Sequence, residues 1–430
     1  MRTLINTLLL SAVLLVFAGC SRHEAASALD AVGSNASSVI AMKPNAVAVS
    51  LGVTDAGDVA ALLPQGRRFA DLRTVLALDG LDMDCWVSAN FREGDKNVSV
   101  MAVRDMDALD KSLGKLGYKK GHSGDFDVYS PANALKASTS MFLLVDGDYL
   151  WMMEAGAAGA AASELKDIKK GATAPLPSWK RESLSGPAAI NAIVEYRSHT
   201  AKVAVDFDAN RMNIDAEGVD ADGESAKWLQ GDGYGHLGVA EASELSAGAM
   251  LSFAVARGDY SDVLRLVSKL GIFEISRAQM AAVSASVAGP VWGNLNIKLP
   301  LNGLDDINAS LSVTAKSSAA AALMLMGAKS ELSRQGLDGF IESRVDGDVL
   351  KLSTSAPVSC GSVDAKDVDG CIAWLNLNIP DEALGMLTGA DRCGIKARAA
   401  LRDERLNISV EFTGSDEPFL STAIQLLGKQ

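Results

Sequence analysis

Residues 145–150 read Val-Asp-Gly-Asp-Tyr-Leu, and residues 345–350 read Val-Asp-Gly-Asp-Val-Leu. In both places Asp-Gly lies between two apolar runs. This is the strongest short signal for a β-hairpin, because a type I′ turn needs positive φ at its two central residues and Asp-Gly tolerates it. The recurrence of nearly the same hairpin sequence predicts that one structural unit occurs twice in the chain.

Two further similarities support this duplication. Residues 47–63 align without gaps to residues 251–267, and residues 211–214 (Arg-Met-Asn-Ile) resemble residues 405–408 (Arg-Leu-Asn-Ile). In the first pair an extended apolar run precedes an acidic residue and then apolar residues at helical spacing. That pattern predicts a strand followed by a helix in each copy.

The predicted fold class follows from the order of elements in each copy. Strands at 46–52 and 249–256 each precede helices, two further strands and another helix, and each copy closes with paired strands, 201–208 with 211–218 and 394–402 with 405–412. Alternating polar and apolar residues in these last strands imply a sheet with one solvated face. We therefore expect an α+β fold, a tandem duplication of one unit of largely antiparallel sheet with helices packed on one face.

The length of 430 residues is too great for one ordinary core and suits two domains. A Gly- and Asp-rich stretch near the middle is the natural linker. The predicted organisation is a signal peptide (1–19), a tether (20–38), a first α+β domain (39–222), a linker (223–247) and a second α+β domain (248–430).

The first twenty residues resemble a lipoprotein signal peptide. Arg2 supplies a positive charge, residues 4–17 are almost wholly apolar, and small side chains at Ala18 and Gly19 precede Cys20. An ordinary secretory signal or a membrane-spanning helix is the alternative, but the apolar run is shorter than the ~20 residues that a bilayer requires. We expect cleavage before Cys20 and its modification by lipid, diacylglyceryl and palmitate, which would anchor the chain to a membrane.

Composition excludes some partners. Hydrophobic residues make up 48% and charged residues 22% of the chain, as in packed globular proteins. The net charge of −13 repels phosphate backbones, so we expect no nucleic acid partner. Besides Cys20 the cysteines are Cys85, Cys360, Cys371 and Cys393; Cys371 could form a disulfide with Cys360 or Cys393, or all four could be buried thiols.

Catalytic and cofactor motifs are weak or absent. Residues 233–238 (Gly-Tyr-Gly-His-Leu-Gly) spell the dinucleotide fingerprint, but no buried strand precedes them, so no cofactor is expected. The four histidines lack the spacing of a helical zinc pair, and no Gly-x-Ser-x-Gly occurs, so neither a metal site nor a serine nucleophile is predicted. No catalytic residue is assigned; enzymatic activity stays open, and a role without catalysis is favoured.

Two tryptophans are the candidate ligand-contact residues. Trp179 and Trp228 lie in the two stretches that fit neither copy of the unit. An exposed tryptophan is uncommon without a use, so these positions predict a binding surface if the side chains are exposed.

Residues 44–51 (Pro-Asn-Ala-Val-Ala-Val-Ser-Leu), the run Gly-Leu-Asp-Met-Asp at 80–84, the segment 100–116 and the lipobox together resemble a family of uncharacterised Bacteroidales envelope lipoproteins with a domain of unknown function. The resemblance implies an outer-membrane lipoprotein and offers no catalytic residues to carry over. Only one acidic residue follows closely after Cys20, at Glu24, so the periplasmic face is favoured over the cell surface.

The functional hypothesis is a membrane-anchored, non-enzymatic binding or scaffolding module with an envelope protein or glycan as partner. One alternative is an envelope hydrolase whose active site has no recognisable motif, which a cleft of clustered carboxylates or histidines with perturbed ionisation would favour. A carrier of an apolar ligand is the other alternative, and an apolar cavity between sheet and helices would support it.

Overall fold

The computed structural model describes residues 27–63, 70–91, 96–131, 140–196, 199–208, 210–226, 235–256, 285–298, 302–354, 361–379, 393–402, 405–413, 418–419 and 421–422. They belong to two compact units, one running to Lys227 and including the chain from Glu417, the other running from Trp228 to Asp416. None of the helices in the described ranges is both long enough and apolar enough to cross a membrane.

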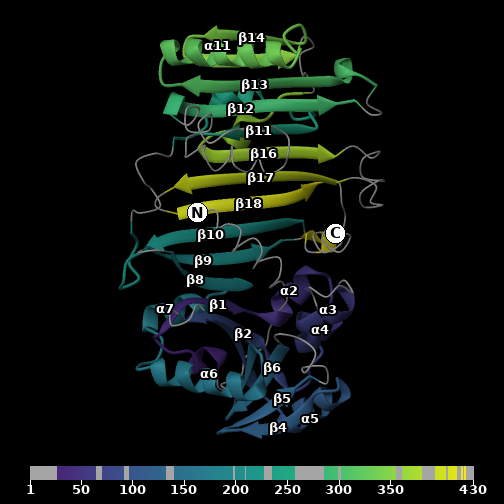
Figure 1. Cartoon of the computed structure of the whole chain (residues 1–430), viewed down its shortest axis with the longest axis vertical. Helices are drawn as coiled ribbons and strands as arrows, with labels where there is room; N and C mark the ends of the chain where they lie inside the picture. Colours follow the sequence, from purple (N-terminus) through teal and green to yellow (C-terminus); the bar gives the residue numbers. More distant parts are fainter. Residues whose placement is uncertain are drawn as a thin grey trace. The chain divides into compact units, whose positions relative to one another are not determined.

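The first unit is built on an antiparallel sheet (Figure 1). Its central strand β1 (Ala36–Met42) pairs with β2 (Leu81–Phe91) on one side and β8 (Ile190–Tyr196) on the other. The pairings give the order β4–β5–β6–β7–β3–β2–β1–β8–β9–β10. The remaining strands are β3 (Lys96–Val103), β4 (Lys119–Ser123), β5 (Phe126–Ser130), β6 (Ser140–Asp146), β7 (Tyr149–Ala155), β9 (His199–Phe207) and β10 (Arg211–Val219).

Both faces of this sheet are buried at its centre. Neighbouring residues along a strand point to opposite faces, and the neighbours Trp86 and Val87 are 6% and 0% exposed, as are Leu150 and Trp151 at 0% and 1%. The covering helices are η1 (Ala28–Ala31), α2 (Pro44–Ser50), α3 (Ala56–Leu62), α4 (Ala70–Leu76), α5 (Met106–Lys115), α6 (Ala158–Gly171) and α7 (Ser178–Leu184). The alternation predicted for the closing strands is seen in β9, where Ala201, Val203 and Val205 are buried and the residues between them are partly exposed.

The second unit has its own antiparallel sheet, in which β11 (Leu251–Val255) pairs with β12 (Val287–Ile297) and β16 (Cys371–Ile379). The order is β14–β15–β13–β12–β11–β16–β17–β18. Trp292 and Trp374 pack in its core. The other elements are β13 (Ile307–Ala315), β14 (Ile341–Asp346), β15 (Val349–Thr354), β17 (Cys393–Arg402), β18 (Arg405–Thr413), α8 (Val239–Glu244), η5 (Leu304–Asp306), α11 (Ser318–Arg334) and α12 (Ala365–Val368).

Glu244, at the end of α8, ties that helix to the sheet of the second unit. Its Oε2 accepts hydrogen bonds from Trp292 Nε1 (2.9 Å) and Ser312 Oγ (3.3 Å), and its Oε1 lies 2.9 Å from Lys351 Nζ. Partial burial raises the pKa of this carboxyl, but the hydrogen bonds from Lys351 and Trp292 outweigh it, so that the net pKa is lowered.

The predicted α+β fold made of two equivalent copies is wrong. Among the described residues, strands account for 46% and helices for 29%. The alignment of 47–63 with 251–267 sets a helix, α2, against a strand, β11. Pro44 begins α2, since proline at the first helical position sacrifices no hydrogen bond and has the right φ. The hairpin β4–β5 and the helices α6 and α7 also make the first unit unlike the second in its described part.

Both predicted hairpins occur, but the two central residues of each turn are Gly-Asp, at 147–148 and 347–348, and not the predicted Asp-Gly. β6 meets β7 with Asp146 opposite Tyr149, and β14 meets β15 with Asp346 opposite Val349. Gly147 and Gly347 have φ of 59° and 64°, the positive values that such turns require. Local turn chemistry therefore decides these elements.

Part of the expected tether is folded. Residues 20–26 lie outside the described residues, but η1 and the start of β1 fall within 27–38, and Ala28, Leu29 and Val32 are buried in the core of the first unit. A capping box closes the start of η1, because Ser27 accepts from Leu29 N and Asp30 accepts from Ser27 N.

Neither Cys371 nor Cys85 forms a disulfide within the described residues. Cys371 pairs with Ala400 while Cys393 pairs with Ile379, so Cys371 and Cys393 lie at opposite ends of the β16–β17 ladder. A disulfide needs Cα atoms within about 7 Å, which this register excludes. Cys360 lies outside the described residues.

Candidate functional site

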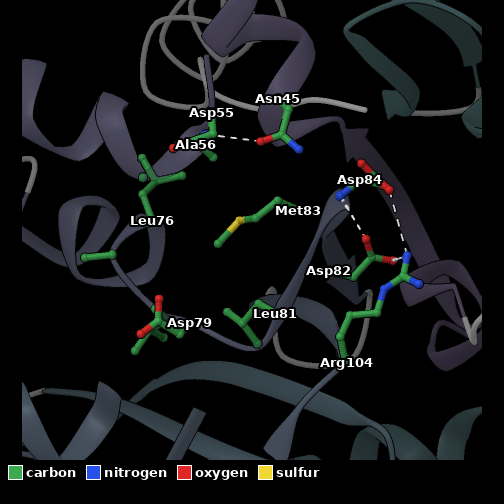
Figure 2. Close-up of a pocket in the computed structure, with 13 residues that line it drawn as sticks. Asn45, Asp55, Ala56, Leu76, Asp79, Leu81, Asp82, Met83, Asp84 and Arg104 are labelled. Atoms are coloured by element: carbon green, nitrogen blue, oxygen red, sulfur yellow. Dashed lines mark hydrogen bonds and ion pairs between the residues drawn. The ribbon is translucent and has the colours of Figure 1, made fainter. Parts of the chain in front are cut away.

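A pocket of about 500 Å³ in the first unit is the candidate site (Figure 2). It forms where β2 begins, because the first residues of that strand leave the regular ladder. Leu81 pairs with Val103 and Trp86 with Met101, so the chain from Asp82 to Cys85 bulges from its partner β3. Bulges of this kind re-aim side chains and are common beside functional sites.

Gly80 sets the direction in which the chain enters this bulge. Its φ is 84°, and a Cβ there would lie 2.2 Å from the carbonyl oxygen of Asp105. The carbonyl of Gly80 accepts hydrogen bonds from the backbone amides of Arg104 (2.7 Å) and Asp105 (3.1 Å). These bonds fix the backbone of Arg104 beside the start of β2.

The ion pair of Asp82 with Arg104 forms one wall of the pocket. Arg104 Nη2 lies 2.9 Å from Asp82 Oδ2 and 3.8 Å from Asp84 Oδ2, and the amide of Asp84 donates to Asp82 Oδ1 at 2.9 Å. The Asp82 side chain is 8% exposed. A carboxylate buried to this degree needs a charged or hydrogen-bonding partner, and Arg104 supplies it.

The first turn of α3 forms a second wall. Asp55 caps the helix by accepting from the amide of Asp58 (3.0 Å), and the amide of Ala56 donates to Asn45 Oδ1 (3.1 Å). These bonds satisfy donors that a helix start leaves unpaired. Asn45 and Asp55 therefore shape the pocket as well as face it.

Charge and apolar surface are combined in this pocket. The complete lining is Asn45, Asp55, Ala56, Gly57, Leu76, Ala77, Leu78, Asp79, Leu81, Asp82, Met83, Asp84 and Arg104. Four carboxylates face one guanidinium, so the lining carries an excess of negative charge. In Figure 2 the side chain of Met83 lies in the middle of the view, between Asp55 and Asp79 on one side and the Arg104 cluster on the other.

The ionisable side chains available here are carboxylates and one guanidinium. The lining has no histidine, cysteine, serine or lysine, and its carboxylates can bind a cation as well as act in acid–base or covalent catalysis. Within the described ranges, no group of three or more His, Cys, Asp or Glu side chains is arranged to hold a metal ion. A positively charged group entering the pocket would meet carboxylates and the apolar surface of Met83 and the leucines.

A second polar cluster lies away from the pocket, where α5 meets the β4–β5 hairpin. Tyr129 Oη donates to Asp110, and Lys120 Nζ lies 3.1 Å from both Asp110 Oδ2 and Asp127 Oδ2. Burial and the hydrogen bond to Asp110 raise the pKa of Tyr129 to about 12. This network joins the hairpin to the helix.

Trp179, one of the two tryptophans predicted to contact a ligand, makes its contacts within the first unit. Trp179, in α7, is half-buried, and its Nε1 donates to Ala221 O at 3.2 Å. Gly223 lies so close to the indole that a Cβ there would be 2.6 Å from Trp179 Cδ2. Trp179 does not line the pocket. Trp228 and Cys20, the predicted site of lipidation, lie outside the described residues.

The sequence pattern alone does not identify the residues that form the pocket. The run Gly80 to Asp84 indicates only the approach to a strand. The available signal is an Asp-x-Asp pair that begins two residues after a glycine and precedes an apolar run, which places two carboxylates at one strand end. Arg104 is distant in sequence from Asp82, and only the pairing of β2 with β3 brings them together.

Comparison with known proteins gives little. No protein-family model and no curated protein matches the chain. A crystal structure of TP0453 (crystal form IV) aligns with TM-score 0.27 and 10% identity over 77% of this chain and 92% of the other. Crystal form I of TP0453 aligns with TM-score 0.22 and 9% identity over 80% and 95%. Likeness at this level carries no inference about function.

Proposed function

We propose that this chain is a lipid-anchored envelope protein that binds an envelope protein partner through a basic side chain inserted into the pocket of the first unit. The observation that carries the proposal is the lining of that pocket, where four carboxylates and only one guanidinium surround an apolar centre. A lysine or arginine side chain has the matching form, an apolar stem with a cationic head.

The pocket already accommodates one such group. The guanidinium of Arg104 lies between the carboxylates of Asp82 and Asp84, at 2.9 Å and 3.8 Å. Asp55 and Asp79 add negative charge on the other side of Met83 (Figure 2). The net charge of −13 also favours approach of a basic partner, since complementary potentials steer association.

The lipid anchor belongs to the same proposal. The lipobox before Cys20 supports export and lipidation, and the resemblance to envelope lipoproteins supports an outer-membrane location with the chain on the periplasmic face. Growth with an alkyne analogue of palmitate should label the wild type and leave Cys20→Ala unlabelled. Equal labelling of both would remove the anchor from the proposal.

Photo-crosslinking in cells tests the binding role. A benzoylphenylalanine placed at Met83, in the middle of the pocket, should trap a partner whose crosslinked peptide contains lysine or arginine beside the link. The same group at Val239, which is 64% exposed in the second unit, is the matched control. A hydrolase would instead give no stable partner and would release a product from envelope extracts, and an apolar ligand would crosslink as a lipid.

A further inference from the structure

Helix α11 in the second unit carries an exposed apolar face. Leu323 and Met326 are 70% and 69% exposed, the two highest values among large apolar side chains in the described part of the chain. Ala319 and Ala322 are exposed beside them. Residues at this spacing share one face of a helix. Among the α11 residues only Ala321 is buried.

The opposite face of α11 is already engaged. Met324 packs against the buried residues Val287 and Val313 of the sheet in the second unit. In Figure 1 the helix lies along β14, the strand at the end of that sheet. The exposed face can therefore contact something else while the helix keeps its packing.

The sequence that contains this face carries charges of one sign up to Ser330; Glu331, next along α11, is paired with Arg334. No acidic residue occurs from Ile307 to Ser330, although the chain has 53 acidic residues in all, and the charged residues in that stretch are Lys316 and Lys329. Both lysines are exposed, one just before the helix and one within it beyond Met326. A helix with exposed apolar side chains and flanking lysines matches a surface of anionic lipid headgroups.

We propose that the face formed by Ala319, Ala322, Leu323 and Met326 docks onto the surface of an anionic lipid bilayer, with Lys316 and Lys329 at the headgroups. This contact would add to membrane binding by the lipid on Cys20, and to that extent it rests on the lipid anchor of the proposed function. A second copy of the chain suits this face less well, because pairing two such faces brings lysines of both copies together.

Vesicle binding of the mature chain carrying Cys20→Ser tests the contact without the anchor. The chain should sediment with vesicles of equimolar phosphatidylcholine and phosphatidylglycerol and not with phosphatidylcholine alone. Leu323→Ser with Met326→Ser should lower partitioning about tenfold, since two large apolar side chains no longer enter the interface. Lys316→Gln with Lys329→Gln should lower partitioning onto anionic vesicles and make that partitioning less dependent on salt concentration.

The matched control is Val239→Ser, which removes another exposed apolar side chain of the second unit and should leave partitioning unchanged. Circular dichroism of each variant checks folding. The proposal is overturned if the Leu323 and Met326 variant binds vesicles as the wild type does, or if the wild type does not bind. It is also overturned if size-exclusion chromatography shows that the same variant instead dissociates a dimer. Loss of pocket binding in an Asp79→Asn variant with vesicle binding retained would separate this result from the proposed function.

Discussion

Replacing Arg104 by methionine is the sharpest test of the pocket wall. The change keeps an apolar stem of similar length and removes the guanidinium that lies 2.9 Å from Asp82. The carboxylate of Asp82, 8% exposed, then keeps the amide of Asp84 as its neighbour but loses its cation. A buried charge without a partner is strongly destabilising.

The expected loss in the free energy of unfolding is roughly 2 to 3 kcal/mol. Removal of one partner from a fully buried pair costs more, but the Arg104 side chain is 30% exposed, so water moderates the loss. Adding Asp82→Asn to Arg104→Met should recover part of it, because no charge then remains buried. The double-mutant cycle should show coupling of about 1 kcal/mol or more between the two residues.

Urea unfolding monitored by tryptophan fluorescence measures these free energies of unfolding. The variants should shift the urea midpoint and leave the m-value unchanged. Lys166→Met is the matched control, because Lys166 lies 3.7 Å from Asp125 with the two side chains 72% and 80% exposed. Lys166→Met should lower the free energy of unfolding by at most about 0.5 kcal/mol. If Arg104→Met is as stable as that control, the reasoning about the pocket wall is refuted.

The remaining predictions concern other residues. Gly80→Ala should lower the free energy of unfolding by roughly 2 kcal/mol or more, because the positive φ and the nearby Asp105 carbonyl both oppose a Cβ. Gly147 also has a positive φ but no atom near the position of a Cβ, so Gly147→Ala should lower it less in the same urea assay. The lowered pKa of Glu244 contributes stability that is complete above the ordinary value of 4.5 and disappears as the pH falls through the folded-state pKa. Glu244→Gln should therefore melt below the wild type near pH 7, with the gap closing in acid; a gap that is constant with pH would contradict this. Burial raises the pKa of the Cys85 thiol to about 11, so iodoacetamide at about pH 8 should label it slowly in the folded protein and quickly in urea, as read by mass spectrometry; equal rates would show that the thiol is not buried.

The elements that the sequence predicts well are those with strong local signals. The hairpins at the two Asp-Gly sequences and the closing strands β9, β10, β17 and β18 occur close to their predicted ranges. Asp105 begins α5 as a cap, its carboxylate accepting from the amide of Ala108 at 3.0 Å. Such turns and caps act over a few residues and can be read without tertiary contacts.

The predicted fold class is wrong because tertiary pairing overrides local pattern. Residues 36–42, predicted within or beside the tether, form the central strand β1, which β2 and β8 hold from both sides. Residues 44–51 have the apolar content of a strand, but Pro44 begins the helix α2, and the side chain of Val47 on this helix is buried. The strands β8 and β16 are also absent from the prediction, and each of them completes a sheet by pairing with a distant segment.

The pocket shows the same limit at the level of a site. Gly80, Asp82 and Arg104 are ordinary residues in the sequence, and their arrangement depends on the irregular register between β2 and β3. An isolated Asp-x-Asp pair is too common in a chain with 53 acidic residues to indicate a site. Trp179, which does stand out in the sequence, packs against Gly223 within its own unit.

The measurement that tests the central claim most directly is a calorimetric titration with N-acetyl-arginine methylamide, compared among the wild type, Asp79→Asn and Asp107→Asn. Asp79 lines the pocket, whereas Asp107 is an exposed aspartate in the first turn of α5 outside it. The account predicts binding with Kd on the order of 1 mM, weakened about fivefold or more in Asp79→Asn and unchanged in Asp107→Asn. Equal affinity in all three proteins, or no binding to the wild type, would contradict the assignment of this pocket to a basic side chain.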